Sequence, residues 1–210
     1  MKVSLTDAGK RFNRDWIFRH LTFTFDHGNS YAIVGPNGSG KSTLLQVLGG
    51  AMQSSEGNIQ WSMGNGQLTP DELFNHVSIC APYLEVVEEM TIREFLRFHA
   101  HFKSLLPSVS VDKIISAMGL DNAVGKQIRY YSSGMKQRVK LAQSFFSDTP
   151  LLLLDEPCTN LDEAGVGLYH TLINDYCKDR LVIVSSNDEV EYKFCKTRIN
   201  ITDYKEGVAT

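Results

Sequence analysis

The chain has 210 residues, and its 21 Lys and Arg against 24 Asp and Glu leave a formal net charge of −3. Hydrophobic residues make up 42% and charged residues 21%, which excludes a disordered chain, a collagen-like repeat and a strongly basic nucleic-acid tail. No apolar run approaches the roughly 20 residues that cross a bilayer, and the polar start does not fit a signal peptide. Four widely separated cysteines lack metal-binding spacing, so we expect reduced thiols in a cytosolic protein.

The first 80 residues are predicted to form strands around a single helix. Residues 21–25 alternate apolar and polar side chains, as a half-buried antiparallel strand does, and residues 30–34 form a second short strand. Residues 57–61 are typical of an edge strand, and residues 77–80 of a further strand. Between these two, residues 64–76 are rich in Gly, Asn and Asp, which indicates a surface connection.

Residues 91–146 are typical of helices. Thr91 and Glu94 match a capping box, in which two side chains satisfy the first backbone amides of a helix. Asp112 is placed to cap a second helix, and Gly119 fits the end of that helix. The middle of the chain is therefore predicted to be helical.

The C-terminal third is predicted to alternate strand, helix and strand. Two nearly continuous apolar runs, residues 151–154 and 181–184, suit parallel strands that are buried on both faces. Between them, Leu168, Leu172 and Tyr176 recur at helical spacing. This order predicts an α/β fold with a parallel sheet.

A phosphate-binding pattern, G-x-x-x-x-G-K-[ST], lies between the strand at 30–34 and a helix. It consists of Gly35, Pro36, Asn37, Gly38, Ser39, Gly40, Lys41 and Ser42, followed by Thr43. The glycines let backbone amides turn toward phosphate oxygens, and the helix N-terminus adds partial positive charge. We expect Lys41 to neutralise the β- and γ-phosphates and Ser42 to ligate Mg²⁺. This context predicts a nucleotide site rather than an ordinary glycine-rich turn.

The strand at residues 151–154 ends in an acidic pair. Asp155 can hold Mg²⁺ through water beside Ser42. Glu156 would face the γ-phosphate and polarise the attacking water, a role worth about 10²–10⁴ in rate. Without the glycine-rich loop, the same residues would simply be a core strand that enters a solvated turn.

A third candidate segment precedes this strand. Ser132, Ser133 and Gly134 open a predicted helix, where hydroxyls and amides can bind an anion. The simpler interpretation is that a serine caps the helix. One face of the helix is apolar and the other is basic, and the apolar residues are Met135, Val139, Ala142 and Phe146.

Together these motifs resemble those of ABC-type ATPases, the nucleotide-binding subunits of ATP-binding-cassette transporters. Residues 35–42 resemble the Walker A loop of that family, and residues 131–135 resemble its signature motif. Residues 151–156 resemble Walker B with the catalytic glutamate, and residues 160–162 resemble the D-loop. The resemblance covers nearly the whole chain in the family's order.

The resemblance implies a P-loop NTPase core with a parallel sheet, an N-terminal antiparallel β-subdomain and an inserted α-helical subdomain. We expect a single ABC ATPase domain over residues 1–210. Residues 1–82 and 147–210 would form the catalytic core, and residues 83–146 the helical subdomain with the signature motif.

The resemblance also implies ATP and Mg²⁺ as ligands, with nucleotide contacts from residues 35–43. Phe12 fits the aromatic side chain on which the family stacks adenine, and Trp16 is the alternative. Either aromatic could instead belong to the core.

The implied assembly is a head-to-tail pair of such subunits, most simply a homodimer. Ser132, Ser133 and Gly134 of one subunit would contact the γ-phosphate of ATP held by the other. ATP binding would close the pair and hydrolysis would release it, which can drive a partner between two states.

Separate transmembrane permease subunits are the implied partners, and they would hold the chain at the cytoplasmic face of the membrane. Their contact surface would map to residues 83–102. Phe95, Phe98 and Phe102 could form part of that surface, or they could be the core of the helical subdomain.

Three positions depart from the family's pattern. The signature has Ser133 in place of its first glycine, with Tyr131 and Met135 at its two ends, although Ser132 and Gly134 are retained. Residues at the other two positions replace a glutamine and a histidine.

The glutamine is replaced by Tyr83, and Glu85 is the nearest carboxylate that could take over its role. The histidine is replaced by Asn187, which can donate a hydrogen bond but cannot carry charge or shuttle a proton. We therefore expect a slow ATPase that relies on Glu156 and Lys41, with Asn187 assisting.

Two other functions remain open at this stage. One is an ABC-type ATPase that acts on nucleic acid or ribosomes, although a net charge of −3 and the lack of a heptad array give that interpretation little support. The other is an ATP-binding subunit that does not hydrolyse.

Overall fold

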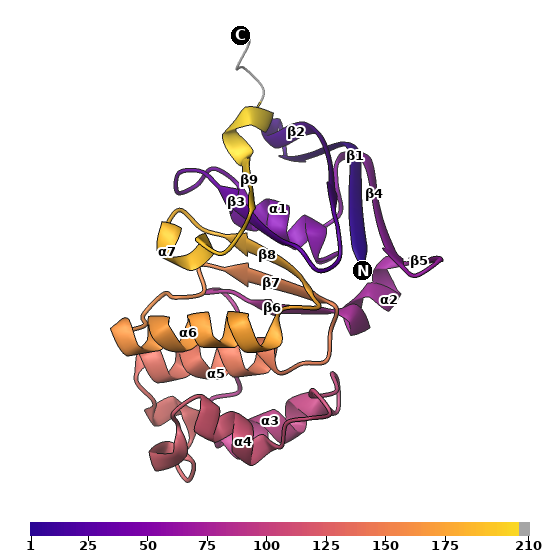
Figure 1. Ribbon diagram of the computed structural model, residues 1–210. Coiled ribbons are helices and arrows are strands. Elements are labelled where there is room, and N and C mark those ends of the chain that lie inside the picture. The colour runs from indigo at the N-terminus through magenta and orange to yellow at the C-terminus, as the bar shows by residue number, and fades with distance from the viewer. Residues whose placement is uncertain (206–210) are drawn as a thin grey trace.

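The computed structural model describes residues 1–205 and contains two β-sheets (Figure 1). One is antiparallel with strand order β2-β1-β4-β5, and the other is parallel with order β6-β7-β8-β3-β9. The antiparallel strands are β1 (Lys2–Phe12), β2 (Asp15–Phe25), β4 (Glu56–Met63) and β5 (Gly66–Leu68). The parallel strands are β3 (Ser30–Val34), β6 (Val77–Cys80), β7 (Leu151–Asp155), β8 (Leu181–Ser185) and β9 (Thr197–Asn200). This combination confirms the predicted α/β class.

The helices lie on both faces of the parallel sheet. Figure 1 shows α5 and α6 side by side on one face, with α3 and α4 beyond α5, and α1 on the side of the antiparallel sheet. The α-helices are α1 (Lys41–Leu48), α2 (Pro70–Leu73), α3 (Ile92–Ala100), α4 (Val111–Ala117), α5 (Ser133–Phe145), α6 (Glu163–Tyr176) and α7 (Glu189–Tyr192). Short 3₁₀-helices cover Phe74–His76, Asp121–Ala123, Ile128–Tyr130 and Ile201–Tyr204. Within residues 1–205, none of the helices is long and apolar enough to cross a membrane.

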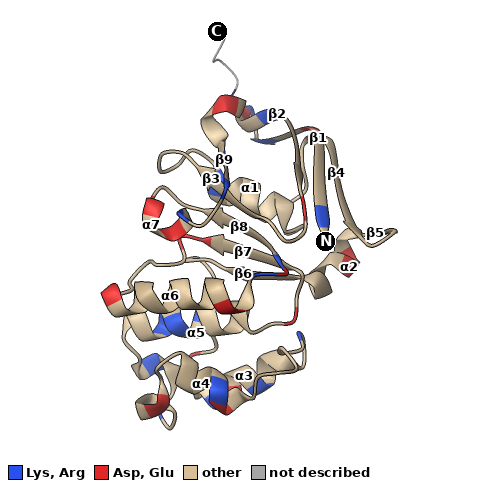
Figure 2. Ribbon diagram, in the orientation of Figure 1, with Lys and Arg blue, Asp and Glu red and all other residues tan. Residues whose placement is uncertain are grey.

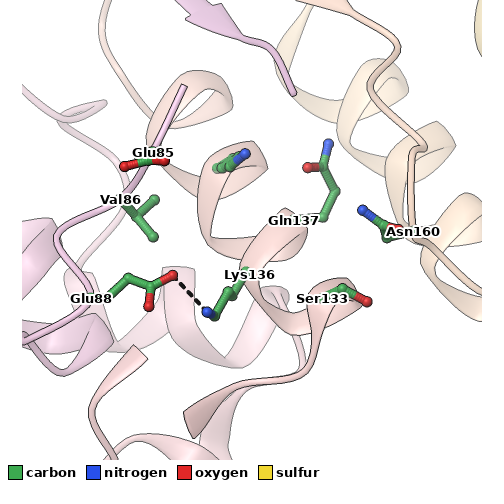
Figure 3. A pocket seen from close by; sticks show the side chains of 8 residues that line it. Glu85, Val86, Glu88, Ser133, Lys136, Gln137 and Asn160 are labelled. Atoms are coloured by element: carbon green, nitrogen blue, oxygen red, sulfur yellow. Dashed lines mark hydrogen bonds and ion pairs between the residues drawn. The ribbon is translucent and has the colours of Figure 1, made fainter. Parts of the chain in front are cut away.

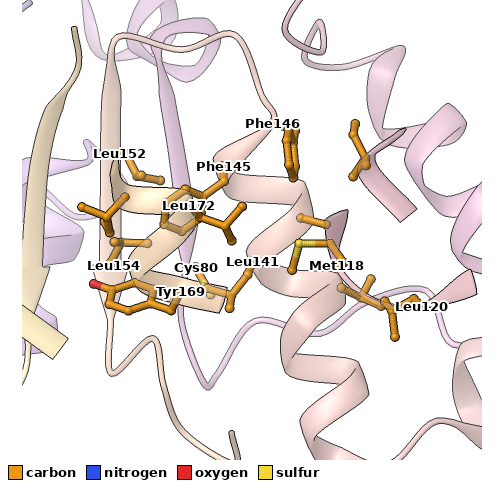
Figure 4. Packing of buried hydrophobic residues seen from close by; sticks show 14 of the residues in the cluster. Cys80, Met118, Leu120, Leu141, Phe145, Phe146, Leu152, Leu154, Tyr169 and Leu172 are labelled. Carbon is orange, nitrogen blue, oxygen red and sulfur yellow. The ribbon is translucent and has the colours of Figure 1, made fainter. Parts of the chain in front are cut away.

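Successive residues of β7, an inner strand between β6 and β8, belong to two separate cores. Leu152 and Leu154 pack in the cluster that contains the helices α3 to α6, where Figure 4 shows them near Tyr169. Leu151 and Leu153 pack instead with α1 and the antiparallel sheet. All four leucines are fully buried, which explains why the sequence of this strand is a continuous apolar run.

Helix caps bear out one prediction and correct another. At α3, the Glu94 N–H donates to the Thr91 hydroxyl and the Thr91 N–H donates to the Glu94 carboxylate, so the capping box is confirmed. At α4, the cap is Ser110 rather than Asp112, which lies within the first turn. The shift arises because α4 starts one residue before Asp112. Gly119 follows the end of α4 with a φ of 65°, as expected for a helix stop.

Three features of the N-terminal part differ from the sequence-based expectation. Strand β4 is an inner strand, because it pairs with both β1 and β5. Residues 64–76 contain β5, α2 and a 3₁₀-helix rather than a plain connection. Strand β1 was not predicted, because its pairing with β2 shifts register and Asp7 has a φ of 50°, which together break the two-residue alternation.

Candidate functional site

The phosphate loop joins the carboxyl end of β3 to the start of α1. Lys41 is only 5% exposed, and its Nζ donates to the carbonyl oxygens of Gly35 at 2.8 Å and Pro36 at 3.2 Å. The Ser39 N–H also donates to the Pro36 carbonyl, at 3.1 Å. The loop therefore wraps around a buried ammonium group.

Glycine is required at two positions of this loop. A Cβ on Gly40, whose φ is 104°, would lie 2.2 Å from Cγ2 of Ile17. A Cβ on Gly35, whose φ is 148°, would lie 2.9 Å from the Ser39 hydroxyl. That hydroxyl is buried and has no hydrogen-bond partner in the described chain. An unpartnered hydroxyl and an ammonium within one glycine-lined loop fit a phosphate group.

The acidic pair lies at the same edge of the parallel sheet. Asp155 is 2% exposed and accepts a hydrogen bond from the Ser185 hydroxyl at 2.7 Å. Glu156 has a φ of 42°, and its N–H donates to the Ser185 carbonyl oxygen at 2.9 Å. Because β3 and β7 both pair in parallel with β8, their carboxyl ends converge, which is where open α/β sheets bind ligands. Figure 2 shows acidic residues gathered at this end of β7 and in α7.

Asn187 contacts the phosphate loop and lines the same hollow as Glu156. Its Nδ2 donates to Oδ1 of Asn37 at 3.0 Å. Asn37, Glu156 and Asn187 all line one hollow of about 310 Å³. The structure thus brings these three predicted site residues together, although they come from three distant parts of the sequence.

Tyr83 lies near the Asp155 carboxylate, whereas Glu85 lines a different hollow. Burial raises the pKa of Tyr83, the nearby Asp155 carboxylate raises it further, and a hydrogen-bonding contact with Gln46 of α1 partly offsets both. Glu85 instead lines a hollow of about 410 Å³ together with residues of α5 such as Lys136 (Figure 3). The alternative in which Glu85 replaces the missing glutamine therefore finds no support in the geometry.

The acidic residues near Glu85 are paired within the chain. Glu88 accepts from Lys136 of α5 at 2.6 Å, the contact drawn in Figure 3, and Glu89 pairs with Arg129 at 3.2 Å. These contacts join the segment after β6 to α5 and the turn before it.

The signature-like segment lies in a different hollow from the phosphate loop. Ser132 caps α5 by accepting from the Met135 N–H at 3.3 Å, so the capping interpretation holds. Ser132, Ser133 and Gly134 line a hollow of about 350 Å³ together with Asp162. Among residues 1–205, the lining of this hollow includes nothing from the phosphate loop. Within one copy of the chain, the signature-like segment and the phosphate loop therefore line different hollows.

Asp162 begins α6 and ties it to α5. Its carboxylate accepts from the Gly165 N–H at 2.8 Å and pairs with Arg138 at 3.3 Å. The hydrogen bond from Gly165 is the main reason that the pKa of Asp162 is lowered, although burial opposes it and Arg138 contributes.

The two candidate aromatics occupy the hairpin between β1 and β2. Phe12 is 45% exposed, with Lys10 Nζ 5.3 Å from its ring centroid. Trp16 has the guanidinium groups of Arg11 and Arg19 at 5.4 and 4.4 Å from its ring. Phe12 therefore offers the more accessible ring.

Two residues at this site were missed by the sequence analysis. Gln137 of α5 and Glu191 of α7 are 3% and 4% exposed, and both contact the backbone that directly follows Glu156. A polar residue within a largely buried helix was the only available signal for Gln137. Nothing in the local pattern around Glu191 distinguishes it from a surface glutamate.

A strand, a glycine-rich loop and a helix beside an acidic strand end define a P-loop nucleotide-binding protein. Within that class, the chain matches the family model described as ABC transporter over residues 18–159. Because this match spans more than half of the chain, the protein belongs to the ABC transporter family of ATP-binding proteins.

Individual relatives and solved structures are similar over most of the chain. It is 28% identical over 187 residues to the ABC transporter ATP-binding protein YybJ of Bacillus subtilis, which covers 88% of this chain and 85% of that protein. It is 30% identical over 165 residues to the cytochrome c biogenesis ATP-binding export protein CcmA of Cupriavidus pinatubonensis, covering 78% and 73%. An ATP-binding subunit of an ABC transporter superimposes with a TM-score of 0.81 at 22% identity, covering 96% of this chain and 86% of that one. The dimeric structure of MJ0796, a bacterial ABC transporter cassette, gives 0.77 at 20% identity, covering 95% and 94%.

Proposed function

We propose that this chain binds ATP with Mg²⁺ and hydrolyses it in a head-to-tail dimer, which moves separate membrane subunits. ATP-binding subunits of this family dimerise and work with membrane permease components. The observation that carries the proposal is the convergence of the phosphate loop with Asp155 and Glu156 at one sheet edge. Asn187 bonded to Asn37 completes that edge.

Each residue of this edge has a chemical task in the proposal. Lys41 would exchange its loop carbonyl partners for phosphate oxygens, and the backbone of residues 35–43 would donate N–H groups to them. Ser42 and Asp155 would hold Mg²⁺, which supplies charge neutralisation when it is bound. Glu156 would orient the attacking water and take up its proton, and Asn187 would donate a hydrogen bond.

The second half of the site would come from another copy of the chain. Ser132, Ser133 and Gly134 lie at the start of a 13-residue helix, where hydroxyls, amides and the helix dipole favour an anion. Their separation from the phosphate loop within one copy is what a head-to-tail pair requires. Phe12 would stack on the adenine ring.

We infer a helical subdomain at residues 83–146 between two parts of the core, 1–82 and 147–210. Its outer surface carries Phe98 and Phe102, which are 42% and 56% exposed and pack edge to face at 5.1 Å. Phe95, by contrast, is buried. We propose that the two exposed rings contact the permease subunits, which would place the chain at the cytoplasmic face of the membrane.

The decisive experiment compares ATP turnover of the purified chain with that of Lys41→Ala, with and without its permease subunits. We expect phosphate release from the wild type to exceed that of Lys41→Ala in the presence of the subunits. Equal rates under both conditions would refute the proposed hydrolysis.

A second candidate function is ATP binding without turnover. It is favoured by one observation, the uncharged Asn187 at the position where the family has a histidine. Tight ATP binding by the wild type, combined with turnover no greater than that of Lys41→Ala under all conditions, would select this second function.

A further inference from the structure

A single peptide group, the one between Pro157 and Cys158, is held from both ends by buried side chains. Gln137 Nε2 donates to the Pro157 carbonyl oxygen at 2.7 Å. The Cys158 N–H donates to Oε1 of Glu191 at 2.6 Å. One side chain thus supplies the donor and the other the acceptor for the same peptide unit.

The two side chains come from elements far apart in the sequence. Gln137 lies in α5, the helix that begins at the signature-like segment, and Figure 3 shows it on the same helix as Ser133. Glu191 lies in α7, four residues after Asn187. The Pro157–Cys158 peptide is therefore the point where both elements contact the end of β7.

Burial of these two polar side chains is unfavourable for stability unless hydrogen bonds compensate for it. Gln137 is 3% exposed and Glu191 is 4% exposed, and burying a polar group is unfavourable unless it is hydrogen-bonded. Oε2 of Glu191 has no hydrogen-bond partner within the described residues. Gln137 Nε2 also lies 3.7 Å from Cys80 Sγ, a weak acceptor. An apolar side chain would fill either space without that cost, so the hydrogen bonds to this peptide are the strongest that the polar groups add.

The peptide lies one residue beyond Glu156, whose backbone is in an unfavourable conformation. A φ of 42° is rare for a residue with a side chain and costs on the order of 1 kcal/mol or more. Such a conformation persists only when its surroundings hold it. Here the Glu156 N–H donates to the Ser185 carbonyl oxygen on one side. On the other side, the second peptide after Glu156 is held by Gln137 and Glu191.

We propose that Gln137 and Glu191 are positioning residues for ATP hydrolysis, which hold the Pro157–Cys158 peptide and thereby aim the Glu156 carboxylate. This inference rests on the proposed function. It also connects α5, the helix that begins at the signature-like segment, to Pro157, the residue after Glu156. A shift of α5 when Ser132–Gly134 engage nucleotide on another copy would reach the catalytic glutamate through Gln137.

The test uses substitutions that change the hydrogen bond but not the size of the side chain. Gln137→Glu replaces the donor by an acceptor next to a carbonyl oxygen. Gln143→Glu makes the same chemical change at a partly buried position on the same helix and is the matched control. We expect Gln137→Glu to lower kcat at least about tenfold with KM changed less than about twofold, because misplacing a catalytic group costs turnover rather than binding. We expect Gln143→Glu to keep the kcat of the wild type.

The role of Glu191 as the hydrogen-bond acceptor is tested by asking whether a conservative substitution restores kcat. Glu191→Ala should lower kcat to a similar extent, and Glu191→Gln, which keeps an oxygen for the Cys158 N–H, should recover most of the loss. If Gln137→Glu does not fold, Gln137→Met, which keeps the volume without a donor, takes its place.

Amide hydrogen exchange of residues 158–161 provides a readout that does not depend on turnover. We expect faster exchange in Gln137→Glu and Glu191→Ala than in the wild type and Gln143→Glu. Unchanged exchange, or wild-type kcat in Gln137→Glu, would overturn the positioning role. Failure of the proposed function is distinct, because it requires the wild type itself to turn over ATP no faster than Lys41→Ala.

Discussion

The two walls of the candidate site are built in different ways. The phosphate loop and α1 form one continuous stretch, and the contacts of Lys41 with Gly35 and Pro36 span only five or six residues. The wall at the end of β7 is assembled from distant segments, since Gln137 and Glu191 reach it across 20 and 33 residues. A local motif can be recognised from sequence, whereas an assembled wall depends on the complete fold.

The largest effect is expected at the end of β7, where Glu156 is proposed to act as the general base. Glu156→Gln removes the carboxylate that would take up a proton but keeps its shape. We expect turnover to fall by about 10²–10⁴, the usual contribution of a general base, while ATP binding is retained. Steady-state phosphate release measures the first and a fluorescent ATP analogue the second. Glu163→Gln, an exposed residue at the start of α6, is the control.

That outcome would be contradicted by turnover of Glu156→Gln within about threefold of the wild type, since such a small effect would exclude a general base at this position. In that case only the phosphate loop, and not the wall at the end of β7, would have a role in the reaction.

The next largest effect tests the packing of the local wall. A Cβ on Gly40 would meet Ile17 at 2.2 Å, whereas a Cβ on Gly38 would meet nothing within 4 Å, although both residues have positive φ. We expect Gly40→Ala to lower the free energy of unfolding by about 2–4 kcal/mol, which combines overpacking with backbone strain. Gly38→Ala should cost about 1 kcal/mol from strain alone. Urea denaturation of both variants provides the measurement, and equal losses would show that Ile17 does not confine the loop.

Much of the fold could be predicted because its signals are local. The apolar run at β7, the capping box of Thr91 and Glu94 and the glycine spacing of residues 35–42 each lie within one turn or strand. The apolar run reflects burial on both faces of a strand, the capping box reflects the unpaired amides of a first helical turn, and the glycine spacing reflects the shape of a phosphate group. Each of these causes acts over only a few residues.

The rest could not be predicted because its causes lie elsewhere in the chain. Gln137 appears in sequence as one polar residue among several on α5, and only the approach of Pro157 explains its burial. Strand β1 escaped prediction because its irregular pairing with β2 removes the alternation. Tyr83 looked like the loss of a functional glutamine until the fold placed it near Asp155 and Gln46.

A further distant contact predicts how stability depends on pH. His99 Nε2 lies 2.8 Å from the Ser147 hydroxyl, and burial, with a contribution from Lys103, lowers the pKa of His99 to about 4. The unfolded chain, with a histidine pKa near about 6.5, then binds a proton that the folded chain does not. Proton uptake by the unfolded chain at His99 therefore lowers the free energy of unfolding as the pH falls from about 6.5 toward 4, and it has no effect above about pH 6.5.

We expect His99→Gln, which can still bond to Ser147, to reduce the loss of unfolding free energy between pH 6.5 and 4. The difference from the wild type should be about 2 kcal/mol at pH 4, allowing for partial exposure of the ring. Urea denaturation across this pH range measures it. His101→Gln is the matched control, and identical pH slopes for wild type and His99→Gln would show that this contact does not couple protonation to folding.

The smallest expected effect concerns a side chain that touches both walls. Tyr83 contacts Gln46 of α1 and lies close enough to Asp155 of β7 for that carboxylate to raise its pKa. Tyr83→Phe removes only the hydroxyl, and we expect turnover to fall about two- to fivefold, the size of one ordinary hydrogen bond. Glu85→Gln, in the separate hollow beside α5, should change turnover less than Tyr83→Phe does. The reverse order would restore Glu85 as the substitute for the missing glutamine. The predicted order would instead mean that an uncharged hydroxyl links α1 to the assembled wall.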